Sequence, residues 1–210
     1  MAIQFRNSGN ASTFASNLAG TINTPSGTSV GDALILYVSW IATGSIAGWN
    51  TLQYNSFREQ GVFWKIADGS DSVSFSAYWS WRACLMFSFY GDNGAIDVSG
   101  SSIRDNWTTS SANFNAVNAD WDVWFAFSGA FFSSAAFVNT YPSWYTNGIR
   151  VPNFGGNNRY HAGWCHKIET TSSETPSTMS RSRSAQMMSF VAWFKEVAVE
   201  WGGTNFFTMF

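Results

Sequence analysis

Apolar and polar residues alternate along much of this 210-residue chain, with the period of two that marks a half-buried β-strand. Residues 72–80 are the clearest case, because Val, Phe, Ala and Trp alternate there with Ser and Tyr. Residues 3–6 and 120–128 follow the same pattern. Residues 34–40 and 84–90 are instead apolar at nearly every position, which predicts central strands covered on both faces.

The segments between these patterns predict turns and loops rather than helices. Residues 185–201 are the one helix candidate, but they lack Leu and are rich in β-branched and aromatic residues, so we interpret them as one long strand. Residues 92–118 are rich in Ser, Asn and Thr and are expected to form a crossover. Residues 140–158 contain two Pro and a Gly-Gly-Asn-Asn cluster and are expected to form a long loop. No βαβ unit is visible, so the chain is expected to be all-β and antiparallel.

The chain also repeats itself. A strand pattern ending in Lys-Ile is followed in both halves by a polar turn and then by an Arg-led apolar run. Lys65 and Lys167 lie 102 positions apart, and Arg82 and Arg183 lie 101 apart. A nearly constant offset over some 25 residues indicates an internal duplication. We therefore expect one two-sheet sandwich built from two related halves.

The expected domain organisation follows from that repeat. Residues 1–210 form a single β-sandwich domain, with half 1 at about residues 1–100 and half 2 at about residues 110–201. Residues 202–210 form a C-terminal tail that carries three Phe after a Gly-Gly pair. Two interpretations of this tail stay open: it hooks into a neighbouring subunit, or it packs in the core of its own sandwich.

Composition suggests that some of the surface is buried against partners. Charged residues make up 11% of the chain, against roughly 25% in ordinary soluble domains. Aromatic residues make up 18%, with 12 Trp. Because monomers rarely leave large apolar patches exposed, part of this aromatic surface is expected to meet other subunits.

Several functional classes are excluded by charge and hydropathy. A net charge of −2 with no basic run argues against nucleic acid as a partner. No apolar run reaches the roughly 20 residues of a membrane helix, so no membrane partner is expected. The N-terminus lacks the apolar core of a signal peptide. Cys84 and Cys165 are expected to lie in corresponding strands of the two halves as reduced core residues.

Six short motifs follow one another in the first half: the turn Thr24-Pro25-Ser26-Gly27, the strand Gly31-Asp32-Ala33-Leu34-Ile35-Leu36, the turn Gly48-Trp49, the strand Val62-Phe63-Trp64-Lys65-Ile66-Ala67, the strand end Phe89-Tyr90-Gly91 and the pair Ala95-Ile96-Asp97. Their order and spacing resemble a β-sandwich module that is widespread in virion structural proteins of tailed bacteriophages. The likeness covers roughly residues 20–100 and, more loosely, the second half to about residue 195.

This resemblance implies a jelly-roll-like sandwich in a virion, assembled in the host cytoplasm, either as a head decoration protein or as a tail-associated protein. Tail fibres are long modular chains, whereas this chain is short, so a capsid cement or decoration subunit is favoured. Its partners are then the major capsid protein or other virion subunits, whose contacts between capsomers it stabilises. A homo-oligomer is expected, and a trimer suits a three-fold lattice position.

No residue pattern in the chain predicts catalysis, a metal or a cofactor. His161, Cys165 and His166 are close in sequence, but on a strand His166 faces away from the other two, so we expect a buried Cys and two hydrogen-bonded His. The segment at residues 68–72 resembles a calcium loop without its bidentate Glu, and a plain turn is favoured. We find no phosphate loop, nucleophile elbow or serine triad. The chain is therefore expected to be non-enzymatic.

The alternative function is a tail-associated receptor- or carbohydrate-binding module. Sugars stack on aromatic rings while Asn and Arg side chains satisfy their hydroxyls, and the loop near residue 144 has that mixture. The competing interpretation, which we favour, is that Trp144 plugs the end of the sandwich as the counterpart of Trp49. The candidate contact residues are Trp144, Tyr145, Asn157 and Arg159 in the loop and Phe206, Phe207 and Phe210 in the tail.

Overall fold

Fourteen strands and no helix make up the part of the chain that the computed structural model describes, which is residues 3–9, 12–14, 18–39, 41–56, 59–77, 82–91, 96–131, 138–151 and 161–196. The first half contains β1 (Gln4–Ser8), β2 (Ser12–Phe14), β3 (Gly20–Ile22), β4 (Ala33–Ser39), β5 (Asn50–Asn55), β6 (Gln60–Ile66), β7 (Val73–Phe75) and β8 (Arg82–Tyr90). The second half contains β9 (Ile96–Ala112), β10 (Val117–Phe131), β11 (Val138–Thr140), β12 (Thr146–Val151), β13 (His161–Glu174) and β14 (Met179–Glu196). The expectation of an all-β chain is confirmed.

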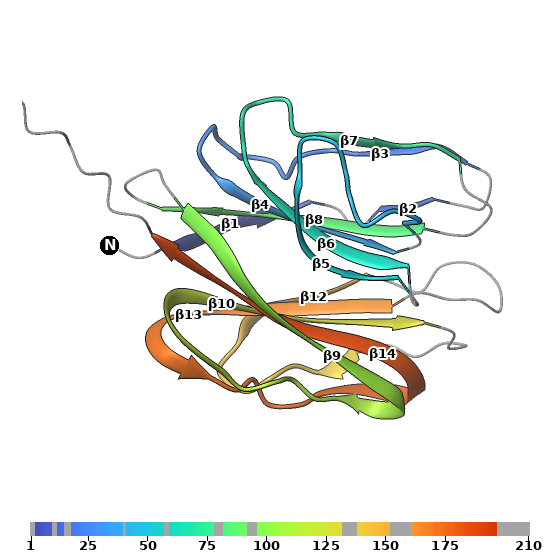
Figure 1. Ribbon diagram of the computed structural model, residues 1–210, viewed down its shortest axis with the longest axis vertical. Coiled ribbons are helices and arrows are strands. Elements are labelled where there is room, and N and C mark those ends of the chain that lie inside the picture. Colours follow the sequence, from blue (N-terminus) through green and yellow to red (C-terminus); the bar gives the residue numbers. More distant parts are fainter. Residues whose placement is uncertain are drawn as a thin grey trace, which may run out of the picture.

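Each half builds one sheet of an antiparallel two-sheet sandwich (Figure 1). The first sheet has the order β1-β8-β4-β6-β5, with β2 also paired to β8. In the second sheet β14 pairs with β9 on one side and β10 on the other, and β13 and β12 follow. The body of that sheet therefore has the order β9-β14-β10-β13-β12, which repeats the first sheet strand for strand. The internal duplication is thus a duplication of sheet topology.

Strand pairing within the first half is nested. β1 pairs with β8, β3 with β7, and β4 with β6, so the chain folds back on itself like one long hairpin that is then rolled up. Nested antiparallel pairs of this kind are the jelly-roll arrangement. The second half repeats the nesting, with β9 paired to β14 and β10 paired to β13. The antiparallel sandwich is confirmed, and the nesting within each half is the feature that it shares with jelly rolls.

Strand pairing shows that, at their last strands, the two halves are offset by more residues than the sequence repeat indicates. Trp64 and His166 are equivalent, because each precedes the repeated Lys and faces the central strand of its sheet, at Ile35 and at Phe125. From these two central residues the ladder continues to Phe87 in β8 and to Ala192 in β14. The offset therefore grows from 102 to 105 positions, and the two Arg residues that are 101 apart in sequence are not structural equivalents.

The two cysteines do not lie in corresponding strands, contrary to expectation. Cys84 lies in β8, whose counterpart is β14, whereas Cys165 lies in β13, whose counterpart is β6. Both are buried free thiols, as expected. They belong to two different apolar clusters, and burial raises the pKa of both thiols.

Three apolar clusters stabilise the sandwich. The central cluster lies between the sheets and draws on both halves, with Phe87 and Phe89 from the first sheet and Trp164, Phe190 and Phe194 from the second. A second cluster covers the opposite face of the first sheet, where the β3–β7 ribbon lies over it (Figure 1). A third, around Cys165 and Val191, lies on the opposite face of the second sheet. Among the aromatic residues whose burial the structure describes, all but Trp144 are thus buried or half-buried within the chain itself.

The central strands were predicted correctly, whereas two connecting segments were not. β4 and β8 are buried on both faces at the centre of the first sheet. Residues 92–118 are not a crossover: most of them form the 17-residue strand β9, which pairs along β14, so the second half starts at Ile96 and not near residue 110. β12 likewise occupies part of the loop expected at residues 140–158. Ser- and Thr-rich sequence is typical of linkers, but here the backbone groups of β9 form hydrogen bonds with the long strand β14.

Candidate functional site

Trp144 lies on a tight turn before the edge strand β12. The Tyr145 amide donates to the Pro142 carbonyl at 3.3 Å, which closes the turn. Trp144 has a φ of 68°, in the left-handed region, and 88% of its surface is exposed. The favoured interpretation, in which Trp144 plugs the end of the sandwich, is therefore wrong.

The first half contains the equivalent turn. There the Trp49 amide donates to the Ile46 carbonyl at 3.0 Å, and β5 begins at the next residue. Asn50 of β5 pairs with Trp64, just as Thr146 of β12 pairs with His166. Register therefore makes the position of Trp49 equivalent to that of the residue before Thr146.

Two consequences follow for the aromatic residues of these turns. Tyr145, and not Trp144, is the counterpart of Trp49, and each of the two packs on the outer apolar cluster of its own sheet. Trp144 is instead the counterpart of Gly48, which has a φ of 76°. Both turns thus need a left-handed residue at the third position, and only the first half supplies Gly there.

A left-handed conformation costs an L-residue about 1–2 kcal/mol, and Gly avoids that cost. It is a rare conformation for a bulky side chain. Lack of room is not the reason for Gly in the first half, because a Cβ built at Gly48 meets nothing within 4 Å. Strained residues of this kind cluster at binding and catalytic sites, because selection for function maintains them against their cost.

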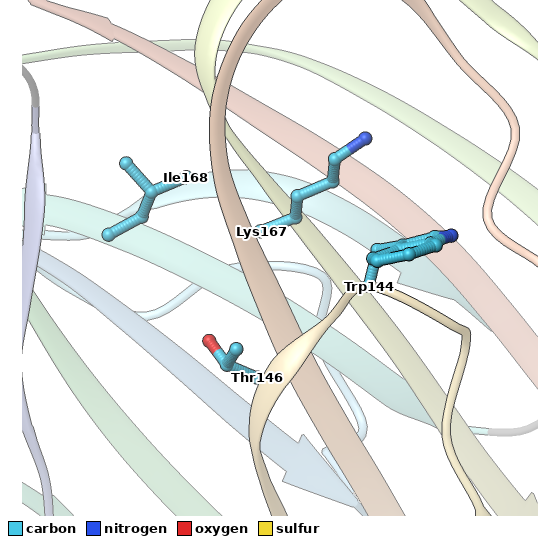
Figure 2. Close-up of a pocket in the computed structure, with 4 residues that line it drawn as sticks. All are labelled: Trp144, Thr146, Lys167 and Ile168. Atoms are coloured by element: carbon cyan, nitrogen blue, oxygen red, sulfur yellow. The ribbon is translucent and has the colours of Figure 1, made fainter.

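Trp144 borders a surface hollow of about 560 Å³ where β12 begins beside β13. The described residues that line it are Trp144, Thr146, Lys167 and Ile168. Figure 2 shows the Trp144 indole and the Lys167 ammonium on one side of the β13 ribbon, with Thr146 and Ile168 on the other. The hollow therefore combines an aromatic face, a hydroxyl, a cation and an apolar side chain.

Polar contacts hold the floor of this hollow in place. Lys167 Nζ lies 3.0 Å from Glu174 Oε2, and both side chains are largely buried. Thr146 Oγ1 donates to the His166 carbonyl at 3.4 Å. Burial raises the pKa of Tyr145 well above its usual value, and the nearby charge of Glu174 raises it further. The Tyr145 ring thus anchors the turn from below while Trp144 projects above it.

The equivalent lysine of the first half is more strongly paired. Lys65 Nζ lies 2.8 Å from Asp71 and 3.0 Å from Asp68, and 6.0 Å from the ring centre of Trp49. Burial alone would lower the pKa of Lys65, but the two carboxylates raise it above its usual value. The Lys of the repeat is thus an ion-pairing position in both halves.

The turn that holds these two carboxylates is structural. The Asp68 carboxylate accepts a hydrogen bond from the Ser70 amide at 2.9 Å, and the Asp71 carboxylate accepts one from the Gly69 amide at 3.1 Å. Gly69 has a φ of 94°. The two carboxylates therefore hold the chain in its bend between β6 and β7.

Cys165 and His166 face opposite sides of β13, as predicted. Cys165 lies in the outer cluster, with Sγ 3.9 Å from the Ala126 carbonyl oxygen. The His166 ring lies in the sandwich core, 4.8 Å from Phe5 and 5.7 Å from Trp164 between ring centres. The His161 side chain is outside the described part. Within that part, no three His, Cys, Asp or Glu side chains are grouped for a metal.

His166 departs from the prediction in one respect. Hydrogen bonding was expected for it, yet among the described residues its buried Nδ1 has no hydrogen-bond partner. Burial lowers its pKa to about 4. The imidazole therefore packs as a neutral aromatic ring at the position that Trp64 occupies in the first sheet.

The other predicted contact residues cannot be placed at the hollow. Asn157, Arg159, Phe206, Phe207 and Phe210 lie outside the described residues. Thr146 belongs to the loop that the sequence pointed to, although it was not among the candidate contact residues. Sequence reasoning missed Lys167 and Ile168, which are the repeated Lys-Ile pair that was used for the duplication but not for a site.

The chain was also compared with known proteins. No family model, curated protein or solved structure matches it. No helix in the described part is long and apolar enough to span a membrane.

Proposed function

We propose that this chain is a non-enzymatic carbohydrate-binding subunit of a tailed-bacteriophage virion, and that it binds sugar at the Trp144 hollow. The observation that carries the proposal is the exposed indole of Trp144, held in a backbone conformation for which the equivalent turn uses Gly. A residue that costs stability and buries almost nothing has a role outside the fold.

The chemistry of the hollow supports a sugar as the ligand. One face of a pyranose ring presents C–H groups, which pack on an exposed aromatic ring and bury apolar surface. Its hydroxyls need polar partners at the rim, where Thr146 provides a hydroxyl and Lys167 a cation, with the Glu174 carboxylate paired to Lys167 beside the hollow. Ligand sites typically combine an apolar wall with a few placed polar groups in this way.

The virion assignment rests on the motifs in residues 20–100 together with the fold. Jelly rolls are common in both viral capsid and lectin domains. The non-enzymatic assignment rests on the hollow itself. A glycosidase needs two carboxyl groups about 5–9.5 Å apart, whereas no Asp or Glu is among the described residues that line the hollow, and the nearby Glu174 is paired with Lys167.

A glycan array probed with the purified chain tests this function, followed by titration of tryptophan fluorescence with the sugars that bind. Binding that is lost in Trp144→Gly and kept in Trp49→Phe supports it. The Trp49→Phe variant is a matched control, because Trp49 lies in the equivalent turn of the other half. If no glycan binds, or if binding survives in Trp144→Gly, the carbohydrate proposal is wrong.

A capsid cement or decoration subunit is the second candidate. Val30 and Ile66 favour it: both are exposed apolar residues, and both lie near the end of β6, where Gly31 hydrogen-bonds to Ala67. A subunit that presses on a capsomer would use such a surface. If this role holds, the chain is stoichiometric on purified capsids, and deletion of residues 203–210 weakens its attachment while the sandwich stays folded. Full capsid occupancy by the truncated chain would contradict the role proposed for the tail.

A further inference from the structure

We infer that the Trp144 hollow selects neutral sugars over acidic ones such as uronates and sialosides. This inference rests on the proposed carbohydrate binding and adds the class of ligand. The observation behind it is that the cation of the hollow is already neutralised by the Lys167–Glu174 pair.

The geometry of that pair determines the charge that a ligand meets. Lys167 Nζ and Glu174 Oε2 are 3.0 Å apart, and the two side chains are 17% and 12% exposed. A carboxylate placed beside Lys167 is therefore also close to the Glu174 carboxylate, whose repulsion offsets the attraction of the ammonium. An acidic sugar would lose its hydration at this site without gaining a net countercharge.

The rest of the described lining points the same way. Trp144, Thr146 and Ile168 carry no charge, and Trp144 and Ile168 offer apolar surface to C–H groups. The chain as a whole has a net charge of −2, which does not attract anions over longer distances. A neutral pyranose, with hydroxyls and a C–H face, meets complementary groups at each of these positions.

The test compares matched pairs of oligosaccharides, namely galactose and glucose oligomers against their uronate counterparts, by tryptophan fluorescence titration of the full chain. Neutral members are expected to bind at least tenfold more tightly than acidic ones. Glu174→Gln leaves the Lys167 charge uncompensated, so it should narrow that gap by about five- to tenfold. Asp68→Asn, in the ion pair of the equivalent Lys65, should leave the gap unchanged.

A second variant keeps the test decisive if Glu174→Gln does not fold. Lys167→Met removes the cation instead, so the gap between neutral and acidic sugars should widen. Trp144→Gly should abolish binding of both classes. Tighter binding of the acidic members, dependent on Trp144, would overturn this inference and leave carbohydrate binding intact. The absence of binding by either class would overturn the proposed function, and the inference with it.

Discussion

The turns at residues 46–49 and 142–145 occupy the same place in two topologically identical sheets, yet they present different surfaces. The first places Gly at its left-handed position and packs the next residue, Trp49, partly against its own sheet. The second packs Tyr145 in that way and places Trp144, 88% exposed, at the left-handed position. Both turns need a left-handed residue at the same position, but they fill it differently. In the first half Gly adopts this conformation without strain, whereas in the second half a strained Trp exposes its indole.

The two halves also differ at the centre of the sandwich, and this gives the largest expected effect. Trp164 is fully buried and lies 3.9 Å from Phe87 between ring centres, whereas Trp64 of the other sheet is only half-buried. Trp164→Ala should lower the free energy of unfolding by about 3–5 kcal/mol. Trp64→Ala should cost clearly less. Chemical denaturation of both variants measures the difference, and equal losses would contradict the asymmetry.

The second expected effect is a dependence of stability on pH. It arises at a position where the two halves differ, because His166 of the second sheet is the counterpart of Trp64 in the first. Burial lowers the pKa of His166 to about 4, from 6.5. Between these values the unfolded chain binds a proton that the folded chain does not, so stability falls as the pH drops from about 6.5 to about 4. The full loss from this group is about 3 kcal/mol.

Urea denaturation across this pH range measures that loss. The control is His166→Phe, which fills the site with a ring that does not titrate and should remove most of the dependence in this window. If the wild-type chain and His166→Phe lose stability in parallel between pH 6.5 and pH 4, another group is responsible and the buried neutral imidazole is not the cause.

The sequence predicted the features that depend on apolar periodicity. Residues 34–40 and 84–90, apolar on both faces, became the central strands β4 and β8, and the repeated Lys-Ile pair led to the duplicated sheet. It failed where pairing context decides the structure. The Ser- and Thr-rich β9 has little intrinsic strand signal and is fixed by β14, a partner more than 80 residues away in parts of the ladder.

The site was harder to predict for a related reason. Large aromatic residues are usually buried, which favoured the interpretation of Trp144 as a plug. Whether a side chain on a turn is buried, however, depends on the direction in which the backbone of the turn points it. The register that makes Trp144 the counterpart of Gly48 depends on strand pairing and is not visible in an ungapped offset. The exposed indole was therefore assigned to the core, and its neighbours on β13 were not recognised.

A smaller effect tests whether the first turn needs its Gly. Gly48→Ala introduces a Cβ that meets no atom within 4 Å, so any cost must come from the backbone at a φ of 76°. We expect a loss of about 1–2 kcal/mol in thermal or chemical unfolding. Gly44→Ala is not a suitable control, because a Cβ there lies 2.8 Å from the Tyr54 ring. No loss in Gly48→Ala would mean that the left-handed position is not strained, and the argument from Trp144 would weaken with it.

The smallest change in stability is the most informative about function. Trp144→Gly converts the second turn to the solution used by the first, which relieves about 1–2 kcal/mol of backbone strain and adds about 0.5–1 kcal/mol of chain entropy to be lost on folding. The net result should be a chain that is unchanged or more stable by at most about 1 kcal/mol, since an 88% exposed side chain contributes little burial. Sugar binding by the same variant should be abolished. Stability and binding would then move independently at one residue, as expected of a side chain kept for a ligand. A clear loss of stability in Trp144→Gly would instead show that the indole supports the fold, and the carbohydrate site would lose its main argument.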